Sequence, residues 1–456
     1  MLAILSTAID IALRHYDGAK QCIVLNKMRD LSLLKTLPEI LSSPDECSFG
    51  MFHGMRVFSM LWIILFHCAV YPLPSTIHSS KVRLKMASTY TFQFILNAWI
   101  SVDTFFFLSG FLMAHSMGKT VDKGLPINFF NKVFTRYWRL FPMAMVTVAL
   151  LFLVHELGDG PLWSEMMGKE LNNCRALWWA TLIGVQNFFS AEHQCLQHLW
   201  YISAEFQLYA VLLLVTYLSQ RWSRTGIGIL AVGAAASVVS VGTLTYVKQY
   251  HPTALFYSTD LDFTREIINN VYIKPSTHAA PYIVGVWAGH VAYSKPSVRM
   301  SKTSRCICWL VSLTVMPLVL FTPAHWSEPR SMVTGVYVLY AATHRFLWAL
   351  AIAWITLDCI WNPKGFISKV LSWPILVPFS RLSYVIYLCH VLVIYLRAWT
   401  IRIPLRNDIM GIVEMGFGTF ALSTILALLL AVLFEKTLVQ VRCLLGRLLG
   451  FLLCRT

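Results

Sequence analysis

The residue whose position most clearly suggests chemistry is His67, the imidazole inside the apolar stretch GMRVFSMLWIILFHCAVYPL at residues 54–73. Arg56 stands near the start of that stretch, which puts His67 roughly 16 Å farther along a helix. If Arg56 sits at a membrane surface, His67 lies near the middle of the bilayer. An ionisable residue there is costly, which favours a functional role. The alternative is a neutral histidine hydrogen-bonded to a neighbouring helix.

A carboxylate at a similar depth comes from the stretch SVDTFFFLSGFLMAH. Asp103 lies roughly 21 Å from the inner end of its segment. A carboxylate next to an imidazole fixes the tautomer of the ring and raises its basicity, which a general base needs. The alternatives are a carboxylate that caps a helix or pairs with an arginine. We therefore expect Asp103 to assist His67.

The stretch SRLSYVIYLCH at residues 380–390 supplies another imidazole at this depth. His390 rises roughly 12–15 Å above Arg381 on a helix. Tyr387 lies three residues before His390 on the same face, and Tyr384 lies six before, so both are expected to hydrogen-bond a substrate or His67. The candidate catalytic residues are therefore His67, Asp103, Tyr387 and His390.

Two arginines open the next apolar segment, in the stretch FTRYWRLFP. Arg136 and Arg139 are three residues apart and share one helix face. Paired guanidiniums bind phosphate bidentately. The alternative is anchoring to lipid headgroups beside Trp and Tyr. With Arg56 on the same side of the membrane, these residues predict a phosphate site made of three arginines.

A polar group also appears at the start of a later segment, HLWYISAEFQLY at residues 198–209. Glu205 and Gln207 fall within the first turns near the outer face, and Trp200 precedes them. An acid in an apolar helix suggests a polar cavity that opens outward. Hydrogen bonding between helices is the alternative role. We expect Trp200, Glu205 and Gln207 to contact a substrate.

The composition identifies the elements that must position these residues. The 456 residues are 57% hydrophobic and 13% charged, with a mean hydropathy of +0.61. A soluble protein has about 25% charged residues. The net charge of +15 lies in short loops between apolar runs, which indicates membrane topology and excludes nucleic acid as a partner. The cysteines lack metal-site spacing, so no metal site is predicted.

Eleven apolar segments can be recognised, and the one at 177–190 is too short to cross easily. If it turns back, the cytoplasmic pieces hold 24 Lys and Arg and the outer pieces 11; if it crosses, the counts become 17 and 18. The positive-inside rule favours the first arrangement. The prediction is an all-α polytopic membrane protein with ten transmembrane helices and a short re-entrant or surface helix at 177–190. The predicted spans are 55–73, 92–116, 137–156, 200–218, 226–247, 279–293, 306–322, 334–358, 382–400 and 411–434.

Around these spans, residues 1–52 are expected to form an apolar stub and a cytoplasmic segment, 53–435 the membrane domain, and 436–456 a basic cytoplasmic tail. Cys174 and Cys195 flank the re-entrant piece on the outer, oxidising side, so we expect a disulfide between them. The alternative is a pair of buried thiols.

Seven stretches of the sequence occur in the order typical of one family. The chain resembles the acyltransferase-3 membrane family, and within it the nose-resistant-to-fluoxetine-like animal group. The resemblance covers about residues 50–440. It rests on GMRVFSMLWIILFH, SVDTFFFLSGFL, FTRYWRLFP, HLWYISAEFQLY, YIKPSTHAAPYIVGVWAG, RLSYVIYLCH and FEKTLVQV.

The resemblance implies an integral-membrane O-acyltransferase fold, with acyl-CoA from the cytosol as donor and a hydroxyl acceptor in or beyond the membrane. His67 would be the catalytic base and Arg56 its partner in the same motif. Arg136 and Arg139 would bind the donor, and Glu205 would belong to the acceptor side. Cys174 and Cys195 match the paired cysteines of the animal group.

The chain also departs from this family. The animal proteins usually carry a cysteine-bearing outer domain and a first span, and here the stretch ILSTAIDIAL resembles only the end of that span. We therefore expect the N-terminal outer domain to be missing from this sequence, either because the gene model is truncated or because the protein is a short form. His278 occupies the place where an arginine is expected.

Two functions follow from these patterns. The first is an enzyme, an acyltransferase that moves groups other than amino-acyl groups, in which the hydroxyl attacks the acyl thioester directly. The second is a lipid or small-molecule uptake protein that keeps the fold without transferase activity. In both cases the protein is a multi-pass membrane protein in the lipid bilayer, of the plasma membrane or the endoplasmic reticulum.

Overall fold

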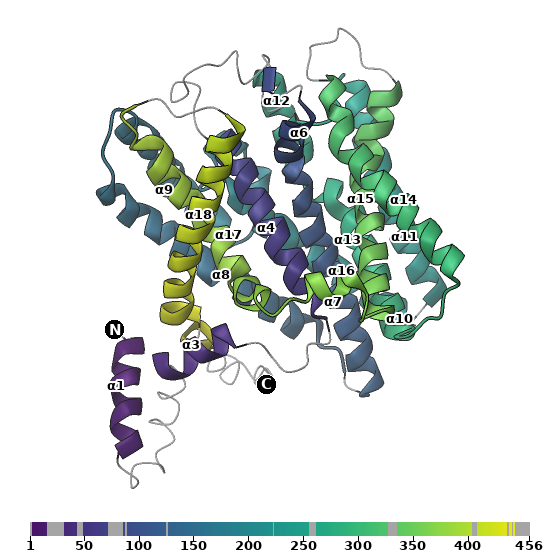
Figure 1. The fold of residues 1–456 in the computed structure, drawn as a ribbon, viewed down its shortest axis with the longest axis horizontal. Coiled ribbons are helices and arrows are strands. Elements are labelled where there is room, and N and C mark those ends of the chain that lie inside the picture. The colour runs from purple at the N-terminus through teal and green to yellow at the C-terminus, as the bar shows by residue number, and fades with distance from the viewer. Residues whose placement is uncertain are drawn as a thin grey trace.

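In the residues that the structure describes, every regular element is a helix. The structure is a computed structural model, and it describes residues 2–15, 32–42, 49–71, 85–86, 89–124, 126–221, 223–254, 261–326, 335–403, 408–435, 437–439 and 441–442. Figure 1 shows long helices side by side in one bundle, with α1 (Leu2–His15) and α3 (Leu33–Leu41) beside its lower end. This architecture confirms the predicted all-α polytopic class. Most of the predicted tail at 436–456 lies outside the described residues.

The long helices match the ten predicted spans. Nine segments of the described chain are long and apolar enough to cross a membrane. The tenth prediction, 279–293, falls on a helix of 20 residues whose histidines and small polar residues lower its hydropathy. In chain order the long helices are α4 (Met51–Val70), α7 (Ser101–Asp122), α8 (Phe129–Val154), α10 (Trp200–Arg221), α11 (Ser223–Val247), α13 (Pro275–Ser294), α14 (Lys302–Phe321), α15 (Gly335–Trp361), α17 (Leu376–Trp399) and α18 (Ile409–Leu430).

The segment predicted at 177–190 has different limits in the structure. It is the C-terminal end of α9 (Trp163–Leu182), a helix of 20 residues, followed by a short turn of helix at Gln186–Phe188. The first half of α9, with Glu165, Lys169 and Glu170, is too polar to appear in a search for apolar runs. The predicted start of this helix, residue 177, therefore lies well after its observed start at Trp163. It is absent from the nine membrane-spanning candidates of the described chain.

Helix α7 lies at the centre of the bundle. In the span that contains it, Tyr90–Asp122, 89% of the most apolar 18-residue stretch is buried inside the protein. In the span Arg224–Val247 the buried share of that stretch is 17%. The peripheral helices therefore present apolar side chains to lipid. Helices α7 and α13 approach through glycines, because a Cβ atom at Gly285 or Gly289 would overlap the carbonyl of Phe107 or Phe111.

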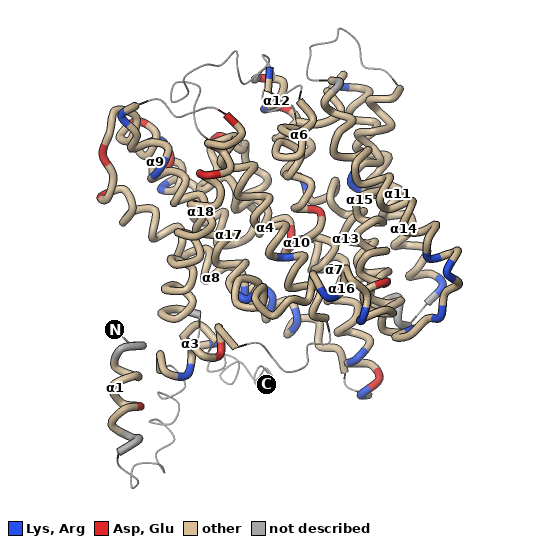
Figure 2. Tube along the Cα trace, viewed as in Figure 1, with Lys and Arg blue, Asp and Glu red and all other residues tan. Residues whose placement is uncertain are grey.

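Charge separates the two ends of the bundle. Figure 2 shows Lys and Arg gathered around the lower ends of the helices, near α3, α7 and α16 (Phe366–Leu371). Each of α4, α8 and α17 carries an arginine in its N-terminal part, at Arg56, Arg136 and Arg381 respectively. The lower end is therefore the side that the charge distribution in the sequence predicts to be cytoplasmic.

Candidate functional site

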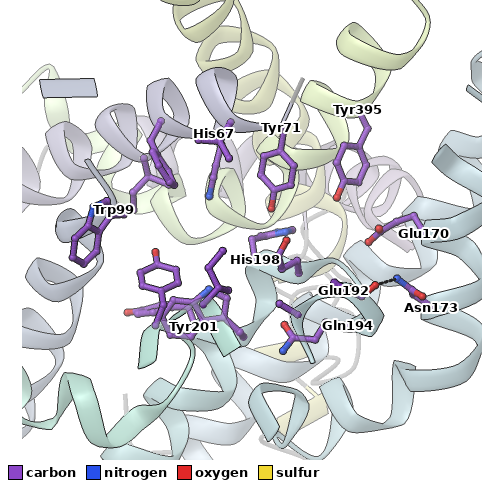
Figure 3. Close-up of a pocket in the computed structure, with 18 of the residues that line it drawn as sticks. His67, Tyr71, Trp99, Glu170, Asn173, Glu192, Gln194, His198, Tyr201 and Tyr395 are labelled. Atoms are coloured by element: carbon purple, nitrogen blue, oxygen red, sulfur yellow. Dashed lines mark hydrogen bonds between the residues drawn. The ribbon is translucent and has the colours of Figure 1, made fainter. Parts of the chain in front are cut away.

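His67 lines a cavity of about 330 Å³, which we call the histidine cavity (Figure 3). His67 comes from α4, and other walls come from α9, from the segment before α10, and from α17. The lining is strongly aromatic. It includes Tyr71, Trp99, Trp200, Tyr201, Tyr272, Tyr387, Tyr395 and Trp399, together with Glu170, Gln194 and His198.

The hydrogen bonds around His67 determine which of its ring nitrogens can act as a base. His390 Nδ1 lies 2.6 Å from the carbonyl oxygen of Tyr387, so this nitrogen must carry a proton and donate it. His390 Nε2 is then an acceptor, and it lies 2.7 Å from His67 Nδ1, which must donate. His67 Nε2 is left with its lone pair, and no described residue donates to it. The network therefore holds His67 in the tautomer of a general base.

The structure does not place Asp103 beside His67, contrary to the sequence prediction. Its Oδ1 atom lies 2.6 Å from Nδ1 of His278, and both side chains are fully buried. Arg345 Nη1 lies 3.2 Å from the other ring nitrogen of His278. The depth of Asp103 was estimated from helical rise alone, whereas the packing of α7 against α13 turns this carboxylate away from α4. Asp103 therefore does not line the histidine cavity. It contacts His278, whose ring stacks on Trp200, and Trp200 lines the cavity.

Tyr387 also differs from its predicted role, because its hydroxyl does not reach His67. The hydroxyl donates to the backbone carbonyl of His198. Its contribution to the site is instead the backbone carbonyl that fixes the tautomer of His390. Tyr384, the other tyrosine of this helix, donates to the carbonyl of Leu140, 2.5 Å away.

His198 and Tyr201 belong to the site, although the sequence patterns did not single them out. His198 is 2% exposed and its Nε2 atom lies 3.2 Å from the carbonyl of Leu388, so its Nδ1 atom is an acceptor, and no residue in the described part of the chain donates to it. Its ring centre lies 5.4 Å from that of His390. The signal for both residues was their place in the stretch HLWYISAEFQLY, beside Trp200.

A second cavity, of about 150 Å³, is lined by Arg56, Arg136 and Arg139, and we call it the arginine cavity. The three arginines thus lie around one cavity, and phosphate binding there stays a prediction. Arg136 forms an ion pair with Glu205, and its Nη2 atom lies 2.7 Å from the hydroxyl of Ser109. A cavity with several guanidiniums is suited to bind phosphate groups.

Glu205 and Gln207 lie away from the outward-opening cavity that the sequence suggested. Glu205 is 1% exposed and lines the arginine cavity, because Arg136 reaches it from α8. The Nε2 atom of Gln207 donates to the carbonyl of Gly184 at 2.8 Å and to the side chain of Asn187 at 2.9 Å. Gln207 thus joins helices, which was the alternative role. Of the three expected substrate contacts, Trp200 alone lines the histidine cavity.

The two cavities are neighbours, and they share four lining residues. These residues form a wall between His67 and the arginines, and we call them the dividing wall. They are Ile63, Val102, Tyr201 and Tyr387.

A disulfide joins Cys174 on α9 to Cys195, as the sequence predicted. It holds the segment that leads into His198, where Leu196 adopts a left-handed conformation with φ of 50°. Glu170 supports this turn by accepting a hydrogen bond of 2.8 Å from the backbone N–H of Leu196. Burial raises the pKa of Glu170 to about 7. Within the described chain, no group of three or more His, Cys, Asp or Glu side chains could hold a metal ion.

The sequence matches one known family over most of its length. The profile of the acyltransferase-3 family, described as an acyltransferase domain, matches residues 51–436. The nose resistant to fluoxetine protein 6 of Caenorhabditis elegans is 26% identical over 77% of this chain and 46% of its own length. The regulator of hypoxia-inducible factor 1 of the same organism is 22% identical over 81% of this chain and 75% of its own.

A bacterial relative gives a name for a reaction. A protein of Staphylococcus aureus (strain COL), whose assigned name is that of an O-acetyltransferase, is 25% identical over 66% of this chain and 47% of its own length. The chain thus spans about half the length of two of these relatives. No solved structure matches the chain. The family profile covers most of the sequence, and the chain therefore belongs to the acyltransferase-3 family of membrane proteins.

Proposed function

We propose that the protein is an O-acyltransferase that moves an acyl group from cytosolic acyl-CoA to a hydroxyl group of an acceptor in or beyond the membrane. The observation that carries this proposal is the His67–His390 pair. It leaves a ring nitrogen of His67 with a free lone pair at the wall of the histidine cavity. The O-acetyltransferase name of the bacterial relative supports the same reaction class.

The chemical step requires one base and no covalent intermediate. The acceptor hydroxyl gives its proton to His67 Nε2 while its oxygen bonds to the carbonyl carbon of the thioester. The carbon–sulfur bond then breaks, and the CoA thiolate takes the proton from His67, which restores the neutral ring. His390 is a positioning residue that stabilises the imidazolium through its Nε2 atom. Tyr201, in the dividing wall, is a candidate donor to the developing oxyanion.

The donor would enter from the end of the bundle where the arginines lie. Arg56, Arg136 and Arg139 would hold the phosphates of CoA in the arginine cavity, and the thioester would reach toward His67 through the dividing wall. The tyrosines of the wall must move for this, because the two cavities are separate in the structure. The acceptor would occupy the aromatic histidine cavity, with Trp200 as one of its contacts.

The test is acyl transfer by purified protein in lipid nanodiscs, with radiolabelled acetyl-CoA and palmitoyl-CoA as donors and thiol release as the readout. His67→Ala is expected to lose about 10²- to 10⁴-fold in kcat, the usual contribution of a general base. Cys68→Ser is the matched control, since Cys68 is the neighbouring buried thiol. It should keep its activity if transfer is direct. Full activity of His67→Ala would refute the proposal.

A second function, uptake of a lipid or small molecule without acyl transfer, is favoured by one observation. Two cavities with a wall of four side chains between them are also the arrangement expected of a translocation path whose gate is closed. Liposome uptake of a labelled amphiphile with no consumption of CoA would support this alternative. CoA consumption that depends on His67 would exclude it.

A further inference from the structure

A fourth arginine lines the arginine cavity. Arg381 comes from the first turns of α17 and shares this cavity with Arg56, Arg136 and Arg139. Its side chain does not pair with a carboxylate in the described structure. It instead donates hydrogen bonds to two backbone carbonyls of α3, those of Glu39 and Ile40, the second at 3.2 Å.

These carbonyls lie in the last turn of α3, where a helix has unsatisfied acceptors and the negative end of its dipole. They are neutral, exposed and monodentate partners for a guanidinium. A phosphate is a charged partner that can bind the same guanidinium bidentately and more strongly. The carbonyls of α3 are therefore replaceable partners for Arg381.

Helix α3 buries one side chain, Thr36, and leaves several others exposed. Ile40 packs against the main hydrophobic core, and the N–H of Leu33 donates to Thr7 on α1 at 2.9 Å. Leu34 and Leu41 are 44% and 52% exposed. Release of α3 from Arg381 would uncover Ile40 and Thr36, but it would leave the lining of the arginine cavity intact, because no described residue of α3 lines it.

We propose that Arg381 is a fourth phosphate-binding arginine, and that α3 is a strap whose carbonyls hold it until a phosphate of the donor displaces them. This inference rests on the proposed function, because CoA supplies the phosphates. Binding of the donor would thus free α3, and release of the donor would let it return.

The test is equilibrium binding of radiolabelled CoA to the full chain in nanodiscs. Arg381→Ala is expected to weaken binding about tenfold, through loss of a charge-assisted contact. Ile40→Ser, which loosens α3, is expected to tighten binding roughly two- to fivefold, because Arg381 loses its competing partners. In the double variant the tightening should vanish. The control is Lys369→Ala, which removes an exposed cation of α16 that does not line the cavity.

Fragments of the donor identify the atoms involved. The effect of Arg381→Ala should appear with adenosine 3′,5′-bisphosphate and be absent with pantetheine. Thermal melting checks that each variant is folded. If Arg381 only anchors α3, Arg381→Ala and Ile40→Ser will shift CoA affinity in the same direction, and the proposal is wrong. It is also wrong if Lys369→Ala weakens binding as much as Arg381→Ala.

The outcomes separate this inference from the proposed function. If folded wild-type protein binds no CoA, both are wrong. If Arg139→Gln weakens CoA binding and Arg381→Ala does not, the donor site stands and the role of Arg381 is refuted.

Discussion

The hydrogen bond between His67 and His390 gives the sharpest prediction. Replacing His390 by Leu removes the acceptor for His67 Nδ1–H, now 2.7 Å away, and leaves that N–H unpaired in a buried site. His67 can then turn or shift its proton to Nε2, and either change removes the lone pair from the cavity. A hydrogen bond of this kind contributes about 1–2 kcal/mol, which corresponds to a decrease in kcat of roughly 5- to 30-fold.

Replacing His390 by Gln should preserve most of the activity. The side-chain oxygen of the Gln can accept the hydrogen bond from His67 Nδ1 that His390 Nε2 accepts in the wild type. The assay is acyl transfer at saturating donor, with kcat and KM measured separately. KM for acyl-CoA should not change, because His390 does not line the arginine cavity.

His344→Leu provides a matched control for this experiment. His344 is also a buried histidine, and its Nδ1 atom lies 2.8 Å from the carbonyl of Tyr340 in its own helix, but it does not contact His67. His344→Leu should therefore lower the stability of the protein, as His390→Leu does, but it should leave kcat unchanged. An unchanged kcat in His390→Leu, or an equal loss in His390→Gln and His390→Leu, would refute the tautomer argument.

Three further predictions concern stability. Arg136→Gln leaves Glu205 buried without its partner and should lower the free energy of unfolding by about 2–4 kcal/mol, with partial recovery in Arg136→Gln/Glu205→Gln, measured by thermal melting. Reduction of Cys174–Cys195, which are 21 residues apart in sequence, should cost about 3 kcal/mol, seen as a lower melting temperature in reductant and as no further effect of reductant on Cys174→Ser. Because burial raises the pKa of Glu170 to about 7, the folded protein keeps a proton that the unfolded chain has already lost. The stability of wild type relative to Glu170→Gln should therefore fall as pH rises from about 4.5 to 7, and a constant difference across that range would contradict the assignment.

The sequence predicted the helices well because a membrane protein must bury its backbone in apolar helices of a fixed length. It also predicted that Arg56, Arg136 and Arg139 gather, since all three lie at one membrane surface. The disulfide between Cys174 and Cys195 followed from the same topology. The polar first half of α9 was missed because hydropathy does not detect a helix whose surface is mixed.

The partners of the buried polar residues could not be predicted in this way. Helical rise gives the depth of Asp103, but its direction depends on how α7 packs against α13, and that depends on glycines such as Gly285. His278 of α13 lies far from Asp103 in sequence, so no local spacing connects them. Likewise, nothing in the spacing of α10 shows that Arg136 reaches Glu205 from α8. The relation between the two cavities is also a tertiary property, because the dividing wall draws its residues from four helices.

The dividing wall also has an electrical consequence. A continuous water-filled path lined by arginines and histidines would conduct protons and chloride across the membrane and dissipate its potential. The side chains of Ile63, Val102, Tyr201 and Tyr387 interrupt such a path. The fold can therefore hold two polar cavities against the same four side chains without joining them into one channel.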